Sequence, residues 1–236
     1  MRMTRQRKDV NAWADLLTTL YENGVDTLHS SMEYESFSLL TEALRLLYKK
    51  SDNIKFKHVV KLADPSFNEE HQSYKRIRIR IEQYKKALMC NQIHMVQWMW
   101  RDDLHNDSLR LSKFSKSIHE LETEIFKIKN DGLINEFLCF PYTLEFGLAS
   151  LESAVIDGYT IYRNPNEILF QPLLDQAYKK SKDVYSIRPL AAGSLIQNAD
   201  WNLNSLIKFS YNHPGVKGII VSISEEKQLL EILNCL

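Results

Sequence analysis

The feature that most constrains the fold is a regular alternation of short apolar runs with longer amphipathic runs along the chain. Val10, Trp13 and Leu17 recur at helical spacing, and this pattern stops at Gly24, a residue suited to the left-handed turn that ends a helix. A β-rich run at residues 25–31 follows at once. Strict strand-then-helix order favours a parallel sheet, and right-handed crossovers then leave a β/α barrel or a doubly wound sheet.

The same unit repeats to the end of the sequence. We predict seven strands, at residues 25–31, 56–63, 93–100, 134–140, 159–163, 184–188 and 218–223. Helices are predicted from residue 10 to Gly24 and near residues 36–49, 68–88, 108–130, 144–154, 167–182, 202–212 and from about 224. Seven strands are one fewer than a closed barrel of this class needs.

The most basic stretch, residues 75–86, alternates like a strand. Ile77, Ile81, Tyr84 and Leu88 nevertheless fall on one helical stripe, so we predict a helix with a basic outer face. Thirty basic and thirty acidic side chains balance over the whole chain, which favours a solvated face over a phosphate-binding or nucleic-acid-binding patch.

Composition bounds the class of protein. The 236 residues, 44% of them hydrophobic, are enough for one large core, and we expect a single domain over residues 1–236. Three cysteines without a CxxC pair favour a reducing compartment. Neither a membrane-spanning run nor a signal peptide is recognisable, so we expect a soluble cytoplasmic protein without nucleic-acid or membrane partners.

Two segments near the C-terminus carry the strongest motif signal. Residues 185–195 (YSIRPLAAGSL) and 213–229 (HPGVKGIIVSISEEKQL) resemble the closing strand-to-helix junctions of an aldo-keto reductase. The resemblance implies an eight-stranded β/α barrel that binds a nicotinamide cofactor at the C-terminal ends of its strands. That family begins with a strand ending in a glycine-threonine-methionine-like turn, and residues 1–3 resemble the tail of this turn. We therefore expect an additional first strand to be encoded upstream.

The resemblance also assigns catalytic positions. The family uses a tyrosine as proton donor, a lysine that lowers the tyrosine pKa, an aspartate that holds the lysine and a histidine that orients the carbonyl. The spacing from Gly24 assigns Tyr34 to the acid and puts His29 at the aspartate position. Asp26 is no substitute, because an offset of three along a strand points to the opposite face. Lys61 matches the lysine at the end of the next strand.

The histidine position falls in residues 93–102, where Met99 stands in its place. A thioether neither donates nor transfers a proton at neutral pH. Arg101, two residues later, is a candidate to stabilise an oxyanion, but we expect it to pair with Asp102 or Asp103.

Loss of the aspartate predicts that Lys61 has no carboxylate partner. Burial without a counter-charge favours the neutral amine, which would no longer acidify Tyr34, and His29 can bond to the lysine without neutralising it. Two interpretations stay open: Tyr34 and Lys61 retain catalysis, or they are inherited residues that now only pack or hydrogen-bond.

The cofactor positions implied by the resemblance lie after the last two predicted strands. The pyrophosphate-facing loop corresponds to Pro189, Leu190, Gly193 and Leu195, and the phosphate and adenine contacts correspond to Ser222, Ser224 and Gln228. Ser224 is also a candidate helix cap. Ser222 replaces a glycine of the family, and Ile232 replaces its asparagine.

The nicotinamide end departs further from the family. Residues 138–142 replace its glycine-x-serine-asparagine, and its amide-holding glutamine would fall near Thr160. Phe140 and Tyr142 are candidates to stack on a ring, although aromatic residues at strand ends more often belong to the core or the rim.

These residues predict a β/α barrel of aldo-keto reductase type, with its site at the C-terminal ends of the strands. Two functions compete. One is NADPH- or NADH-dependent reduction of a small carbonyl substrate, with Tyr34 as acid, Lys61 as its partner and Arg101 or His29 compensating for the altered tetrad. The other is an inactive barrel that binds a ligand or a partner. The histidines have no metal-binding spacing, and no GxxxxGK or GxSxG motif is present.

Overall fold

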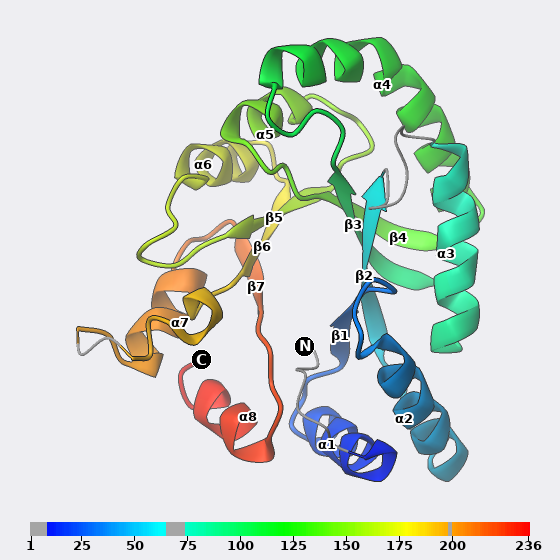
Figure 1. Ribbon diagram of the computed structural model, residues 1–236, viewed down its shortest axis with the longest axis vertical. Helices are drawn as coiled ribbons and strands as arrows, with labels where there is room; N and C mark the ends of the chain where they lie inside the picture. The colour runs from blue at the N-terminus through cyan, green and yellow to red at the C-terminus, as the bar shows by residue number, and fades with distance from the viewer. Residues whose placement is uncertain (1–8, 65–73, 198–199) are drawn as a thin grey trace.

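Seven parallel strands form one curved sheet in which each strand pairs with the next along the chain. This computed structural model describes residues 9–64, 74–197 and 200–236. The spatial order from β1 to β7 is the sequence order, whereas a doubly wound sheet reverses its order part-way. Figure 1 shows the sheet as an arc with helices along its outer side. The predicted β/α barrel is confirmed.

The described elements follow the predicted alternation. The strands are β1 (Thr27–Ser30), β2 (Lys57–Asp64), β3 (Ile93–Trp100), β4 (Ile134–Cys139), β5 (Gly158–Tyr162), β6 (Asp183–Ile187) and β7 (Val216–Ile220). The helices are α1 (Val10–Glu22), α2 (Phe37–Lys50), α3 (Lys75–Leu88), α4 (Asp107–Asn130), α5 (Leu144–Ser150), α6 (Gln171–Lys179), α7 (Leu203–Tyr211) and α8 (Glu226–Leu233), with a short 3₁₀ helix η1 (Ala191–Gly193). In these ranges no helix is long and apolar enough to cross a membrane.

Two helices are shorter than predicted. α5 ends at Ser150 rather than at residue 154, because Glu122 of α4 accepts the backbone N–H of Ala154 at 3.0 Å. α6 begins at Gln171 rather than at 167, because Asn164 and Glu167 form a turn closed by a side-chain hydrogen bond of 2.5 Å. The predicted start of α3 near residue 68 and the turn expected at residues 1–3 lie outside the described residues.

The sequence signals for α1 and α3 are confirmed. Asp9 caps α1 by accepting the N–H of Ala12 at 2.8 Å, and Gly24 just beyond the helix has a φ of +81°. The buried stripe of α3 is the predicted one, Ile77, Ile81, Tyr84 and Leu88. A helical interpretation of the basic stretch is therefore correct.

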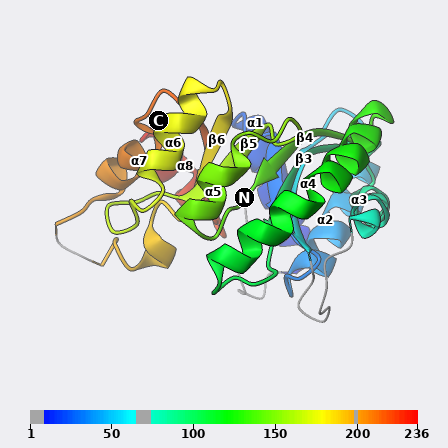
Figure 2. The ribbon, with the colours of Figure 1, turned by 90° about the horizontal axis from the view of Figure 1, so that it is seen from above.

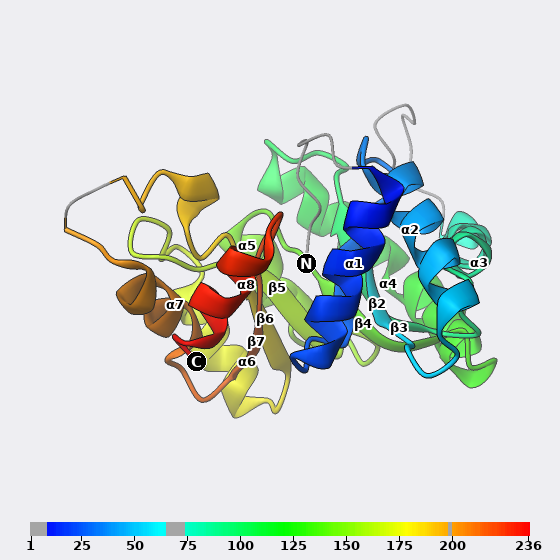
Figure 3. The ribbon, with the colours of Figure 1, turned by 90° about the horizontal axis from the view of Figure 1, so that it is seen from below.

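Apolar side chains fill both faces of the sheet. The main core lies between the sheet and the helices and includes Val60, Trp98 and Phe137. A second cluster of Val59, Met95 and Leu138, with Tyr185 packed against it, comes from the alternate strand positions that face the inside of the barrel. In the views from above and below, the helices surround the strands (Figures 2 and 3).

The sheet ends at β1 on one side and at β7 on the other, and α1 and α8 pack against each other beside these ends (Figure 1). Because all seven strands are parallel, the loops that follow them open at one end of the barrel. We call this end the mouth. It consists of the C-terminal ends of β1 to β7 and the loops that follow them.

Candidate active site

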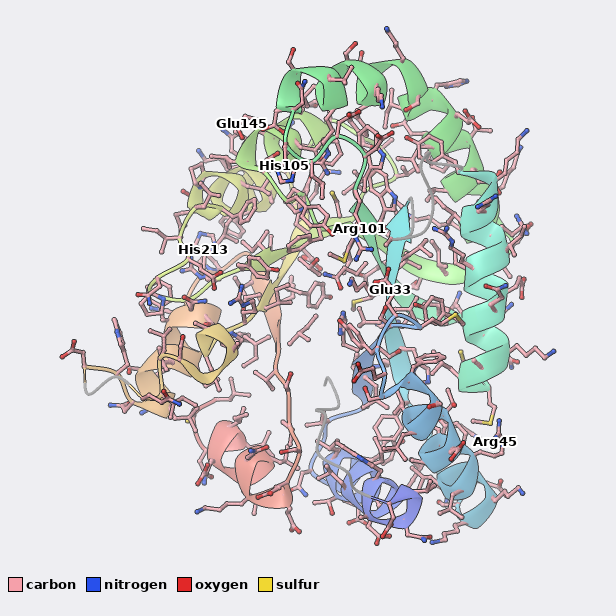
Figure 4. All side chains as sticks on the ribbon, in the orientation of Figure 1. Glu33, Arg45, Arg101, His105, Glu145 and His213 are labelled. Carbon is pink, nitrogen blue, oxygen red and sulfur yellow. The ribbon has the colours of Figure 1, made fainter. Side chains whose placement is uncertain are left out.

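Two cations and one carboxylate meet where β1, β2 and β3 reach the mouth. Lys61 lies in β2, Arg101 directly follows β3, and Glu33 lies in the loop after β1. Lys61 Nζ is 2.9 Å from Glu33 Oε2, and Arg101 donates from Nη1 and Nη2 to the two oxygens of Glu33 at 2.8 and 3.1 Å. The side chains of Lys61, Arg101 and Glu33 are only 13%, 10% and 22% exposed. Figure 4 shows Glu33 and Arg101 close together, apart from Arg45 and His213.

Both partners in the Glu33–Arg101 contact are charged at neutral pH. Burial alone would raise the pKa of Glu33, but hydrogen bonds from Arg101 and Lys61 hold it below its ordinary value. Burial likewise opposes the charge on Arg101, but hydrogen bonds to Glu33 and Tyr142 raise its pKa. The carboxylate is thus ionised and shared between two cations.

Tyr34 lies beside this group. The Lys61 Nζ atom is 5.5 Å from the centroid of the Tyr34 ring, within the range of a cation–π contact. The rings of Tyr34 and His29 are 6.3 Å apart between centroids. The two predicted catalytic residues are therefore neighbours, while their catalytic role stays a prediction.

A buried tyrosine on α3 connects the loop that carries Tyr34 to the strand that carries Lys61. The Tyr84 hydroxyl accepts the N–H of Met32 at 2.9 Å and donates to the carbonyl of Lys61 at 2.7 Å. Its side chain is 3% exposed, and burial raises its pKa. One hydroxyl group thereby fixes the spacing between the first two loops of the mouth.

His29 belongs to a polar layer below the ion pairs, inside the barrel. Its Nε2 is 2.6 Å from Oε1 of Gln97, and Gln97 Nε2 donates to Thr160 Oγ1 at 2.9 Å. An amide oxygen only accepts, so His29 donates from Nε2. Thr160, predicted to lie near the position of the family's glutamine, thus accepts a hydrogen bond from Gln97 of β3.

Two pairing predictions are wrong. Lys61 does have a carboxylate partner, Glu33. Arg101 pairs with Glu33, while Asp102 and Asp103 contact Lys113 of α4 at 3.1 and 2.5 Å. Asp103 has a φ of +50°, which turns the chain toward α4 just after β3. The signal missed in the sequence is a carboxylate directly preceding the candidate acid.

Aromatic rings cover the ends of β4 and β5. Phe140 makes edge contacts with Tyr142 and Tyr162 at centroid distances of 4.8 and 5.1 Å, and Phe140 is 1% exposed. Arg101 Nε donates to the Tyr142 hydroxyl at 3.0 Å, and the Arg188 guanidinium lies 4.8 Å from the Tyr162 ring centroid. Phe140 belongs to the core, and Tyr142 and Tyr162 form the adjoining rim.

A fully buried arginine supports this part of the mouth from behind. Arg110 of α4 donates to the carbonyls of Pro141 and Trp100 at 2.8 and 2.6 Å, and its guanidinium lies 3.9 Å from the Phe146 ring centroid. These carbonyls directly precede Tyr142 and Arg101 in the sequence. Arg110 therefore holds together the chain ends that carry the Arg101–Tyr142 hydrogen bond.

Comparison with known proteins gives likenesses at the level of structure. No family model matches the chain, and no curated protein sequence matches it. A putative aldo-keto reductase from Pseudomonas aeruginosa superposes with a TM-score of 0.75 at 20% identity, over 99% of this chain and 85% of that one. The chain has the aldo-keto reductase fold. The resemblance found in the sequence is thus confirmed for the architecture.

Two further structures agree. The holo form of an aldo-keto reductase from Bacillus halodurans gives a TM-score of 0.76 at 12% identity, over 97% of this chain and 83% of that one. An aldo-keto reductase from Klebsiella pneumoniae in complex with NADPH gives 0.70 at 16% identity, over 96% and 78%. At such identities the comparison establishes the fold alone.

In this aldo-keto reductase fold, the candidate pyrophosphate loop follows β6 and is tightly turned. Gly193 has a φ of +93°, and an added Cβ would meet no atom within 4 Å, so the glycine is needed for its backbone angle. Positive φ values of 46° to 59° are also found at Arg188, Ala191 and Ala192. Pro189 and Leu195 are buried, and Leu190 packs against the core. The loop is therefore a tight turn that packs against the core.

The candidate adenine-end residues follow β7. Ser222 is exposed, whereas Ser224 is buried and donates from its N–H and hydroxyl to Gln228 Oε1 at 2.8 and 3.1 Å. The prediction that Ser224 caps α8 is wrong, because the N-cap is Glu225. Ile232 is 6% exposed and belongs to the core.

A cleft of about 590 Å³ lies elsewhere, at the C-terminal end of α7 and the start of β7. It is lined by Lys208, Tyr211, Asn212, His213, Pro214, Val216, Cys235 and Leu236. None of the predicted site residues is among them. Because β/α barrels place their chemistry at the C-terminal ends of the strands, the mouth is the candidate site and the cleft is not.

Proposed function

We propose that this chain is an NAD(P)H-dependent carbonyl reductase in which Tyr34 is the proton donor and Lys61 is its electrostatic partner. The observation that carries the proposal is the position of the Lys61 ammonium, 5.5 Å from the Tyr34 ring centroid at the mouth of an aldo-keto reductase fold. A cation beside a phenol favours the phenolate, which eases transfer of the phenolic proton. The fold alone would not support an activity, since barrels host many reactions.

The proposed reaction needs one proton from the protein. A nicotinamide cofactor held at the mouth would supply the hydride to the carbonyl carbon. The electron pair of the broken C=O π bond moves to oxygen, which takes the proton of the Tyr34 hydroxyl, and solvent then restores that proton. Arg101, which donates to the Tyr142 hydroxyl at 3.0 Å, is the proposed group that would stabilise charge developing on this oxygen.

The proposed site fits the pyrophosphate of a nicotinamide cofactor better than it fits the nicotinamide ring. The turn at Gly193 allows close backbone approach, which supports a pyrophosphate contact. Ser222 is exposed and follows β7, the strand that pairs with β6. The nicotinamide carboxamide would have to use other groups than in the family, since Phe140 and Tyr142 occupy the end of β4. An NADPH complex of one structural neighbour adds support for this cofactor class.

The second candidate function is a barrel that binds a ligand or partner without catalysis. It is favoured by the same aromatic cluster, because Phe140 is packed edge-on by both Tyr142 and Tyr162. In a barrel without catalysis, Tyr34 and Lys61 would contribute to packing and hydrogen bonding only.

Cofactor binding distinguishes the two functions. The test is quenching of Trp13, Trp98, Trp100 and Trp201 fluorescence on titration with NADPH and with NADH, followed by a screen of aldehydes and ketones. The reductase proposal expects saturable micromolar binding and carbonyl reduction that Tyr34→Phe abolishes while binding persists. A folded protein without cofactor binding would refute it and leave the non-catalytic barrel.

A further inference from the structure

The mouth contains a carboxylate that is not at the family's aspartate position but contacts the same lysine. Glu33 is one residue before Tyr34, in the loop after β1, and its Oε2 is 2.9 Å from Lys61 Nζ. The expected aspartate position is His29, four residues before Glu33 and within β1, and its Nε2 faces Gln97. The negative charge beside Lys61 therefore comes from the loop rather than from the strand.

We propose that Glu33 is the positioning residue that keeps Lys61 protonated beside Tyr34, replacing the missing aspartate from a different element. The inference rests on the reductase proposal for its catalytic consequence, but its charge effect on Lys61 is independent of any reaction.

The contacts of Glu33 support this role. A carboxylate binding an arginine through both oxygens is held in a fixed plane, and Arg101 binds Glu33 in this way at 2.8 and 3.1 Å. Arg101 is itself anchored by Tyr142 at 3.0 Å. These contacts with Arg101 fix the orientation of the Glu33 carboxylate next to Lys61.

The low exposure of this site strengthens the interaction between the Glu33 carboxylate and the Lys61 ammonium. Lys61 is 13% exposed, so solvent screens its interaction with Glu33 much less than that of a surface pair. Two cations so close to each other would repel without the carboxylate between them. Removing Glu33 would therefore favour the neutral amine of Lys61, because Arg101 stays charged.

The chain offers a matched control on the same two strands. Lys57 begins β2, and it pairs at 2.8 Å with Asp26, which directly precedes β1. This pair joins the same strands at the end opposite to the mouth. Asp26→Asn removes the same kind of charge without touching the site.

The first readout needs no cofactor and no reaction. Free protein is acetylated with a limiting amount of an amine-reactive ester at pH 8, and the rates at Lys61 and Lys57 are measured by peptide mass spectrometry against the 84% exposed Lys227. Glu33→Gln is expected to raise the relative rate at Lys61 severalfold, and Glu33→Asp is expected to restore part of the protection. Asp26→Asn should leave Lys61 unchanged.

The second readout is kinetic, for whichever carbonyl substrate the screen finds. Glu33→Gln is expected to lower kcat about 10- to 100-fold and to shift the pH profile of kcat, with NADPH binding unchanged. Equal acetylation of Lys61 in the wild type and in folded Glu33→Gln would overturn the inference. Absent NADPH binding with altered acetylation would instead refute the reductase and leave the charge role of Glu33 standing.

Discussion

Strand β2 carries two lysine–carboxylate pairs, one at its first residue and one four residues later toward the mouth, which have similar N–O distances but different exposure. At the start of the strand, Lys57 and Asp26 meet at 2.8 Å with side chains 53% and 45% exposed. At the mouth, Lys61 and Glu33 meet at 2.9 Å with side chains 13% and 22% exposed. The first is a solvated surface pair of the kind that contributes little to stability. The second is shielded and shared with Arg101.

The comparison shows why distance alone does not identify a functional pair. Around Lys61 the neighbours are a second cation, a tyrosine ring and a loop fixed by Tyr84. The hydrogen bond that Lys57 donates to Asp26 raises the lysine pKa, and it lowers the pKa of Asp26 although partial burial opposes this. Shielding from water and convergence of several groups distinguish the mouth.

The largest expected effect comes from replacing Lys61, with replacement of Lys57 in the same strand as the control. Lys61→Met should lower kcat for carbonyl reduction about 10²- to 10³-fold, because Tyr34 would lose the cation that eases its proton transfer. Lys57→Met should leave kcat unchanged. The measurement is kcat of both variants by steady-state kinetics, with a substrate from the carbonyl screen. Equal kcat values would mean that the two lysines do not differ in function.

The second expected effect concerns the support of the mouth. Arg110→Ala should lower the free energy of unfolding by about 3–5 kcal/mol, because the carbonyls of Trp100 and Pro141 lose their donors and a cavity remains. Arg110→Met, which keeps most of the volume, should cost about half of that. Urea denaturation monitored by circular dichroism measures both. Equal losses for the two variants would assign the effect to the lost hydrogen bonds alone.

The two lysine–carboxylate pairs of β2 also show how far the sequence could predict this molecule. Strands and helices were predictable because apolar spacing is a local property, as in the stripe Ile77, Ile81 and Tyr84 of α3. Asp26 was correctly excluded from the site, since it lies before the strand and pairs with Lys57. Lys61 and Tyr34 were predicted from the resemblance to the family's motifs, and the barrel brings the two side chains next to each other.

Glu33 and Arg110 could not be found in this way. The position of Glu33 beside Lys61 depends on how the loop after β1 folds back, which Tyr84 of α3 fixes from more than fifty positions along the chain. Arg110 looks like a solvated helix residue until α4 packs it against the ends of β3 and β4. The pairing of Arg101 was mispredicted because sequence neighbours were preferred over a partner in the distant loop after β1.

A third prediction uses the residue next to Lys57. His58 is 1% exposed, neither ring nitrogen has a hydrogen-bond partner within the described residues, and burial lowers its pKa to about 4. The unfolded chain takes up the proton near pH 6.5, so stability is full above that pH and falls between pH 6.5 and 4. Through His58 alone, the free energy of unfolding should be lower at pH 4.5 than at pH 7 by about 2–3 kcal/mol.

The measurement is urea denaturation of the wild type and of His58→Phe at pH 7 and pH 4.5. The variant lacks the titrating group, so its loss of stability between the two pH values should be smaller by that amount. Identical pH dependence would mean that His58 is solvated or paired in the folded protein, and the acid sensitivity would then belong to other groups.

The smallest effect is expected for the surface pair itself. Asp26→Asn should leave the melting temperature unchanged within error at low and at high salt, because water and ions already screen the Lys57 charge. Glu33→Gln should lower it at both salt concentrations, because Lys61 and Arg101 would lose the shielded Glu33 carboxylate that both of them contact. Thermal melts in 20 mM and 1 M NaCl (about 20 Å and 3 Å screening lengths) test this directly. If Asp26→Asn lowered the melting temperature as much as Glu33→Gln, the two ion pairs would contribute equally to stability. The Lys61–Glu33 pair at the mouth would then not be special.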